Sequence, residues 1–173
     1  ILEPMLRGTP VPVSPADLPL LTRWVIKTAM VLEHLGANVS NKFFLPAEHS
    51  AVRTGITLPA NVYVWLAHVA DPSLAASAHE DDLTFRLDDY PSAAPGVGYT
   101  STLSAGAFAF QLLCLRPHAL LLPSAEPEFT NGVGWQAYEQ QLWPAAPPVT
   151  WPPPQALDHQ RLTLYAKRFV PGA

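Results

Sequence analysis

The sequence is poor in two kinds of residue: it contains a single cysteine, Cys114, and only 14% of its 173 residues are charged. One thiol excludes an internal disulfide bond and a zinc site built on several cysteines. The apolar stretches are interrupted too often for a bilayer-spanning helix, which needs about 20 mostly apolar residues. Because the printed sequence shows no secretory leader pattern, we expect no membrane segment and a cytoplasmic location.

The net charge of the chain is −4, which argues against tight electrostatic binding of nucleic acid by this chain alone. Hydrophobic residues make up 49% of the sequence, a composition typical of globular proteins and not of disordered ones. A length of 173 residues suits one domain with a sizeable core, so we expect a single domain over residues 1–173.

The longest predicted helix lies between residues 14 and 35. Ser14 is a suitable N-cap, and Asp17 follows it three residues later, as in a capping box. Gly36 suits the C-terminal end. The stripe expected to be buried comprises Leu18, Leu21, Val25, Thr28, Leu32 and Leu35, widened by Leu20, Trp24 and Val31. An apolar surface this wide predicts a central helix that is covered on most sides.

A narrow polar line is expected on the far side of this helix, formed by Arg23, Lys27 and His34. These cations either extend along the helix surface while their stems cover apolar neighbours, or they mark a binding site. A lysine buried in so apolar a helix needs a partner, and Glu48 is a plausible one. Glu48 belongs to a second, short helix that we predict over residues 46–53.

The middle third of the chain changes to the period of β-strands. Residues 61–69 are apolar on both faces, as in an inner strand, whereas residues 83–89 alternate between apolar and polar. Residues 98–116 hold two strand-like runs around a tight turn or a bulge at residues 105–106. We predict an α+β fold in which a central helix and a C-terminal helix pack on an antiparallel sheet of four or five strands.

Proline dominates residues 143–155, so this segment is neither a helix nor a central strand. We predict an extended proline-rich strap in which Trp143 and Trp151 are held against the core. A proline-motif ligand for a partner domain is the alternative, although no basic residue flanks the prolines. A closing helix is predicted over residues 155–169.

No sequence motif of catalysis or of cofactor binding is evident. The six histidines are dispersed, and none pairs with another histidine, a cysteine or an acid at ligand spacing on one element; they are His34, His49, His68, His79, His118 and His159. The acidic run at residues 79–82 is interpreted as a solvated turn. Cys114 lies in an apolar run and is expected to be buried. We therefore expect no catalytic residue, no metal site and no cofactor in this chain.

Four short segments together resemble a family of bacterial HNH-endonuclease-like proteins. They are Leu2–Leu6, Trp24 with Lys27-Thr28-Ala29, Val64–Ala67 and Trp151–Pro153. In that family a zinc-bound HNH-type module with paired cysteines precedes a segment of this kind. The resemblance covers nearly the whole chain. It implies that the chain is the non-nuclease segment, a fragment lacking the upstream module.

The cysteines and histidines of the nuclease module have no counterparts here, so its metal ligands and catalytic residues are not carried over. The resemblance implies an accessory domain that positions substrate or regulates the nuclease, without a reaction of its own. Its expected partner is the upstream module, and nucleic acid is expected to bind only through the parent protein. The candidate binding residues are Arg23, Trp24, Lys27, Glu48 and Trp65.

Two other functions are compatible with the sequence. The first is a free-standing module that binds a small molecule or a protein partner, because five tryptophans and five tyrosines are enough to line a pocket. The second is a hydrolase with an unrecognised site, which has no specific support from the spacing of residues. The presence or absence of an upstream module in the parent protein separates the accessory domain from the free-standing one.

Overall fold

The computed structural model describes residues 1–35, 42–55, 58, 61–73, 76–85, 95–116, 134–144 and 148–169. Gly36, predicted to end the longest helix, lies outside these ranges. The helices are α1 (Leu2–Leu6), α2 (Asp17–Leu35), α3 (Pro46–Thr54), the short 3-10 helix η1 (Trp135–Ala137) and α4 (His159–Lys167). The strands are β1 (Val11–Val13), β2 (Val62–Val69), β3 (Ser77–Phe85), β4 (Gly96–Ala105), β5 (Phe108–Arg116), β6 (Glu139–Trp143), β7 (Val149–Trp151) and β8 (Ala156–Leu157). None of the helices in these ranges has the length and apolar character needed to cross a membrane.

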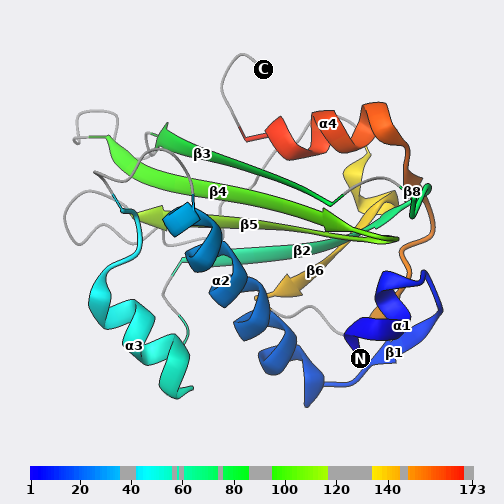
Figure 1. Cartoon of the computed structure of the whole chain (residues 1–173), viewed down its shortest axis with the longest axis horizontal. Coiled ribbons are helices and arrows are strands. Elements are labelled where there is room, and N and C mark those ends of the chain that lie inside the picture. Colours follow the sequence, from blue (N-terminus) through cyan, green and yellow to red (C-terminus); the bar gives the residue numbers. More distant parts are fainter. Residues whose placement is uncertain are drawn as a thin grey trace.

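The predicted α+β fold is confirmed. The main sheet has the strand order β3-β4-β5-β2-β6, with every neighbouring pair antiparallel, and the two-residue β8 adds a short parallel pairing to β2. A separate two-stranded sheet joins β1 to β7. Figure 1 shows α2 crossing one side of the main sheet with α3 beside it, while α4 lies along another side of the molecule.

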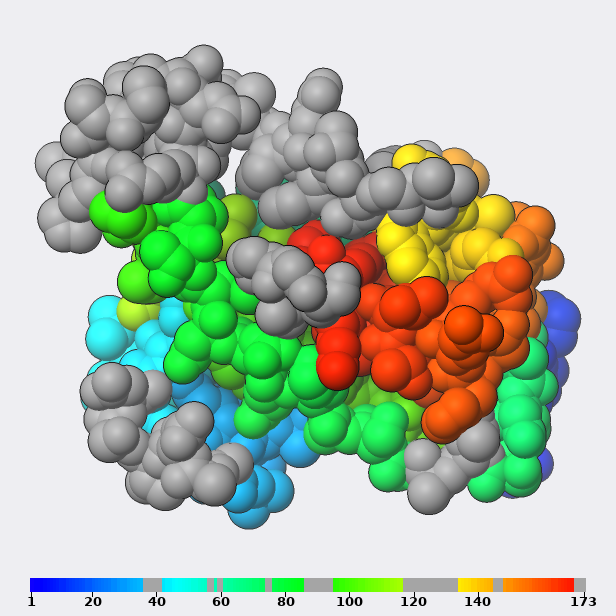
Figure 2. Space-filling view, turned by 90° about the horizontal axis from the view of Figure 1, so that it is seen from above, coloured from blue at the N-terminus to red at the C-terminus, as the bar shows by residue number. Residues whose placement is uncertain are grey.

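The two inner strands are covered on both faces, and this divides the core into layers. Val64 and Leu112 share a register position and pack in the cluster that also contains Val25 of α2. The next residues along the strands point the opposite way, and Ala67 of β2 packs with Tyr165 of α4. Helix α4, orange to red in Figure 2, lies next to β3 in green. Thus α2 and α4 bury opposite faces of one sheet.

Local sequence signals explain where several of these elements begin and end. The predicted capping box at the start of α2 is confirmed: the Asp17 amide donates to Ser14 Oγ, and the Ser14 amide donates to the Asp17 carboxylate, both at 3.3 Å. The open choice at residues 105–106 is resolved as a tight turn between β4 and β5. Gly106 has φ +57°, and a Cβ there would lie 2.5 Å from the Leu6 carbonyl oxygen, so glycine is required.

The predicted buried stripe of α2 is confirmed at Leu18, Leu21 and Val25, but it is wrong toward the C-terminal end of the helix. The buried side chains include Ile26 and Met30, whereas Leu35 is 77% exposed and Leu20 is 61% exposed. Trp24, Thr28 and Leu32, which were also expected to be buried, are only partly buried. Because apolar residues surround most of this helix, periodicity alone does not distinguish the face that meets the sheet.

Two further predictions about secondary structure are corrected. Residues 79–82 are not a turn but part of the edge strand β3. His79 and Asp81 lie on one face of this strand, with His79 Nε2 2.6 Å from Asp81 Oδ2. The closing helix begins at His159 and not at Gln155, because Ala156 and Leu157 pair with β2 and Asp158 caps the helix. The alternation predicted for residues 83–89 holds for residues 83–85, and residues 86–89 lie outside the described ranges.

The proline-rich segment is described in part, because residues 145–147 lie outside the described ranges. Trp151 is 3% exposed and its ring packs against Phe108 at 5.6 Å between centroids. Trp143 is partly buried. The continuous strap remains a prediction.

Removing the Trp151 ring tests how far this segment contributes to the core. Trp151→Ala should lower the free energy of unfolding by about 3–5 kcal/mol, because a fully buried ring is replaced by a cavity. Pro154→Ala is the control, since Pro154 is exposed and its replacement should change stability by less than about 0.5 kcal/mol. Urea unfolding followed by circular dichroism measures both. A Trp151→Ala variant as stable as the wild type would show that the ring is not part of the core.

A buried ion pair joins α4 to the sheet and provides a second test. Arg168 donates to Glu139 at 2.7 Å, and the two side chains are 3% and 9% exposed. Arg168→Met leaves Glu139 with an uncompensated charge and should cost about 3 kcal/mol or more. Lys167→Met, at an exposed position, should be nearly neutral. The double variant Arg168→Met/Glu139→Gln should recover part of the loss in the same unfolding assay. No recovery would contradict the ion-pair explanation.

Candidate functional site

The five candidate binding residues do not form one site. Trp65 is separated from the others because it lies on the α4 face of the sheet, where the Arg168 guanidinium lies 4.8 Å from its ring centroid. Trp24 lies on the α2 side and packs edge-on against Phe108 and Phe110, so its ring belongs to the core. Alternation along β2 explains the separation, since neighbouring side chains of a strand point to opposite faces.

Arg23 and Glu48 both have structural partners. Arg23 donates to the Gly55 carbonyl oxygen at 3.0 Å and so connects α2 to the end of α3. Glu48 accepts a hydrogen bond from the Leu45 amide at 2.7 Å at the start of α3, and it also forms an ion pair with Arg116. The predicted pairing of Lys27 with Glu48 is therefore wrong, because Glu48 pairs with Arg116 on β5 instead.

Lys27 is exposed and lines a groove between α2 and α3. None of the ion pairs within the described ranges includes Lys27. The groove has a volume of about 770 Å³, and its lining is Lys27, Met30, Val31, His34, Leu35, Lys42, Phe44, Pro46, His49, Ser50 and Arg53. Three of these are permanent cations and two are histidines, while no acidic residue is among the described residues that line it. The groove is thus a local concentration of positive charge on a chain of net charge −4.

The positions of the groove cations follow from the two helices. Lys27 and His34 are seven residues apart on α2, which places them on one side two turns apart. His49 and Arg53 are four residues apart on α3 and share a face in the same way. Lys42 donates from its ammonium group to the Glu33 carbonyl oxygen at the end of α2. Both helices therefore present their basic sides to the same groove.

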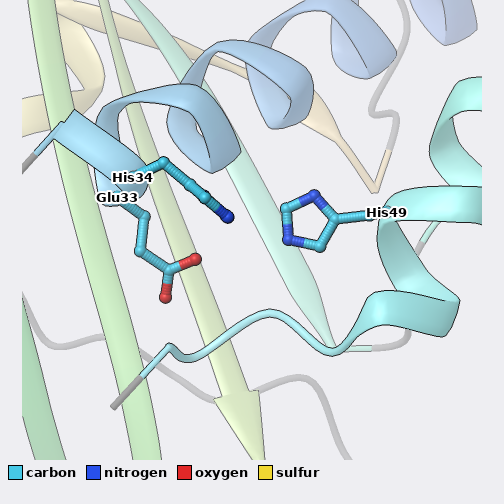
Figure 3. A group of neighbouring side chains, drawn as sticks. All are labelled: Glu33, His34 and His49. Carbon is cyan, nitrogen blue, oxygen red and sulfur yellow. The ribbon is translucent and has the colours of Figure 1, made fainter. Parts of the chain in front are cut away.

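Glu33, at the end of α2, is hydrogen-bonded to the segment that leads into α3. Its side chain is buried, and one carboxylate oxygen accepts hydrogen bonds from the backbone amides of Phe43 and Phe44, the second at 3.4 Å. His34 and His49 lie next to it, with ring centroids 5.1 Å apart in an edge-to-face arrangement. Figure 3 shows the His34 ring directed toward His49, with the Glu33 carboxylate beside them. Two histidines and one acid from separate helices thus meet at one end of the groove.

Lys42, His49 and Arg53 were not predicted from the sequence as site residues. The spacing of His49 and Arg53 was a usable signal, because residues four apart share a helix face. What the sequence did not supply was the placement of α3 against α2. That placement involves long-range hydrogen bonds that Glu33 accepts from the Phe43 and Phe44 amides and that Arg23 donates to the Gly55 carbonyl oxygen.

Two other groups with reactive atoms are unsuited to covalent chemistry. Burial raises the pKa of the Cys114 thiol well above its ordinary value, so the sulfur keeps its proton and is a poor nucleophile. Burial, together with the hydrogen bond and the charge of Glu80, raises the pKa of the Tyr99 hydroxyl, which also stays protonated. Neither group therefore adds a candidate catalytic site, and the groove between α2 and α3 is the candidate functional site that we take forward.

No family model matches the chain, and neither the characterised proteins nor the solved structures compared with it gave a match.

The roles of Arg23 and Lys27 are separated by a pair of matched substitutions. Arg23→Met should lower the free energy of unfolding by about 1–2 kcal/mol, because the Gly55 carbonyl loses its partly buried donor. Lys27→Met should change it by less than about 0.5 kcal/mol, because the stem is kept and the exposed charge that is removed has no ion-pair partner among the described residues. Chemical unfolding of both variants tests this. An equal cost for the two would show that Lys27 also has a structural role.

Proposed function

We propose that the chain is the accessory domain of an HNH-nuclease-like bacterial protein and that its groove between α2 and α3 holds phosphate groups of the nucleic-acid substrate. The resemblance of four sequence segments to that family supports the context. The observation that supports the role is the charge of the groove: Lys27, Lys42 and Arg53 line it together, without an acidic neighbour among the described lining residues. Such a cationic groove suits the sugar–phosphate backbone, which carries one negative charge per nucleotide.

The binding contributed by this domain is weak by itself. A few cations on a chain of net charge −4 cannot match the basic surfaces of dedicated DNA-binding domains. The groove instead orients a strand that the nuclease module of the parent protein also holds. Joining two weak sites in one protein raises the effective concentration of the strand at the second site. The domain carries out no reaction of its own in this proposal.

An exposed apolar side of α2 supports a contact with the parent's upstream module. Leu20, Val31 and Leu35 are 61%, 57% and 77% exposed, respectively. Their spacing of eleven and four residues places them along one side of the helix. Val31 and Leu35 also line the groove, so an apolar contact here would adjoin its basic residues. This contact belongs to the same proposal, since the upstream module is the partner that the family resemblance implies.

Fluorescence anisotropy with a labelled oligonucleotide tests the role of the groove. In buffer with a chelator, we expect a Kd above about 10 µM at physiological salt and tighter binding at low salt, because phosphate binding releases counterions. At low salt, Lys27→Gln/Arg53→Gln should weaken binding by about tenfold. The same change should lower the slope of the salt dependence by about one for each phosphate that is no longer neutralised.

The matched control removes two positive charges from α4. Arg161→Gln/Lys167→Gln changes the net charge equally, but both residues are exposed on the opposite side of the sheet from α2. It should leave binding near the wild-type value. If both double variants weaken binding equally, the effect comes from net charge and the groove has no specific role.

A further inference from the structure

Three side chains with metal-binding atoms meet where α2 ends and α3 begins. Glu33 and His34 lie in the last turn of α2, and His49 lies in α3. One potential ligand atom from each residue lies within 4.8 Å of the other two. Figure 3 shows the three side chains converging from two helices. Each of the three groups has a feature that suits it to bind a cation.

Glu33 supplies a buried oxygen that has no partner among the described residues. The residue is only 8% exposed, and its Oε1 accepts the two backbone amides that precede α3. Its Oε2 is fully buried and receives no hydrogen bond from any described group. An unsatisfied buried carboxylate oxygen is costly, and a bound cation is one of the few groups that remove this cost.

His34 is oriented by a hydrogen bond that leaves its Nε2 able to bind a metal ion. Its Nδ1 lies 2.8 Å from the Met30 carbonyl oxygen. A carbonyl oxygen only accepts hydrogen bonds, so Nδ1 carries the proton and the Nε2 lone pair of the neutral ring is available. Histidines that bind metals in proteins commonly donate their other ring nitrogen to a backbone carbonyl in this way, because it fixes the orientation of the ring.

His49 completes the set and has room to adjust. Its ring is partly buried and faces the His34 ring at 5.1 Å between centroids. Zinc bound at about 2.0–2.1 Å in tetrahedral geometry holds its ligand atoms about 3.3 Å apart. The ligand atoms here, within 4.8 Å, are too far apart by up to roughly 1.5 Å. Zinc binding would therefore require a side-chain rotation, which we assign to His49 because the hydrogen bond to Met30 orients the His34 ring.

We propose that Glu33, His34 and His49 form a binding site for a divalent transition-metal ion and that zinc is the ion it suits best. Two imidazoles and one carboxylate are ligands that zinc accepts, and three protein ligands leave a fourth position open. Lys27, Lys42 and Arg53 line the adjoining groove, so an anionic oxygen such as that of a phosphate is the fitting fourth ligand. This last step alone rests on the proposed function.

The site was not expected from the sequence, because its two histidines lie on different helices and not at ligand spacing on one element. Glu33 and His34 are adjacent in sequence, and His49 comes fifteen residues after His34 on a different helix. The two hydrogen bonds from the Phe43 and Phe44 amides to Glu33 place the start of α3 against α2 and thereby bring His49 to His34. The expectation that the chain contains no metal site is replaced by this proposal.

The test is a titration of the chelator-stripped chain with zinc chloride in phosphate-free buffer, followed by calorimetry. We expect one zinc ion per chain. His34→Ala, His49→Ala and Glu33→Gln should each raise the Kd for zinc at least about tenfold. Glu33→Gln keeps an oxygen that accepts the two backbone amides while it replaces the second oxygen with an amide nitrogen, so the fold is preserved. Cobalt(II) gives a second readout, because its visible absorption reports a change of ligands directly.

Two control variants distinguish this site from other histidines. His159→Ala removes an exposed histidine of α4, and His79→Ala removes the histidine paired with Asp81 on β3. Both should bind zinc as the wild type does. The proposal is overturned if the wild type binds no zinc, or if the three site variants bind zinc as well as the controls do. Oligonucleotide binding in the presence of chelator is measured separately, so failure of the metal site and failure of the proposed phosphate-binding role are distinguishable.

Discussion

The buried carboxylate of Glu33 fixes the part of the molecule on which its functional features depend. It accepts the backbone amides of Phe43 and Phe44, and the Lys42 ammonium group donates to the Glu33 carbonyl oxygen. A carboxylate of this kind is tolerated inside a protein because backbone donors replace the water it has lost. Since α3 begins directly after these residues, its direction relative to α2 is set at this point. The groove, its cations and the pair of histidines all follow from that one placement.

The sheet provides the rigid support on which this placement is possible. Strands β2 and β5 are buried on both faces, with α2 on one side and α4 on the other. The Arg168–Glu139 pair closes the α4 side, where the Arg168 guanidinium also lies against the ring of Tyr165 at 4.4 Å. The α4 side also has a cavity of about 430 Å³, between β3 and α4. The α2 side has the larger groove, which combines basic side chains with exposed leucine and valine side chains.

The sequence predicted those parts of the fold that depend on local signals. The start of α2, the extent of α3 and the doubly buried strand β2 follow from caps and periodicity. At residues 105–106 the sequence left a tight turn and a bulge as alternatives. It failed where the outcome depended on tertiary context. The buried side of α2 was misjudged toward its C-terminal end because leucine and valine surround the helix, and residues 79–82 were mistaken for a turn because an edge strand can carry charges that a central strand cannot. Trp65 and Lys27 were both named as candidate binding residues, but Trp65 lies on the face of the sheet that α4 covers, whereas Lys27 lies on α2 at the other face. The basic residues on α2 gave part of the candidate site, but the other part depends on how α3 packs against α2, which the sequence does not predict.

The electrostatics of the groove connect its cations to the histidine–glutamate cluster. Three fixed positive charges disfavour a divalent cation nearby, and the single negative charge of Glu33 offsets only part of that repulsion. A phosphate group in the groove changes this balance, because it attracts the cations and the metal at once and supplies an oxygen to the open coordination position. By linkage, metal then favours phosphate to the same degree that phosphate favours metal. If the proposed metal site is occupied, the groove would favour an anion and a divalent cation together. The local charge pattern, and not the net charge of −4, therefore determines what this chain is suited to bind.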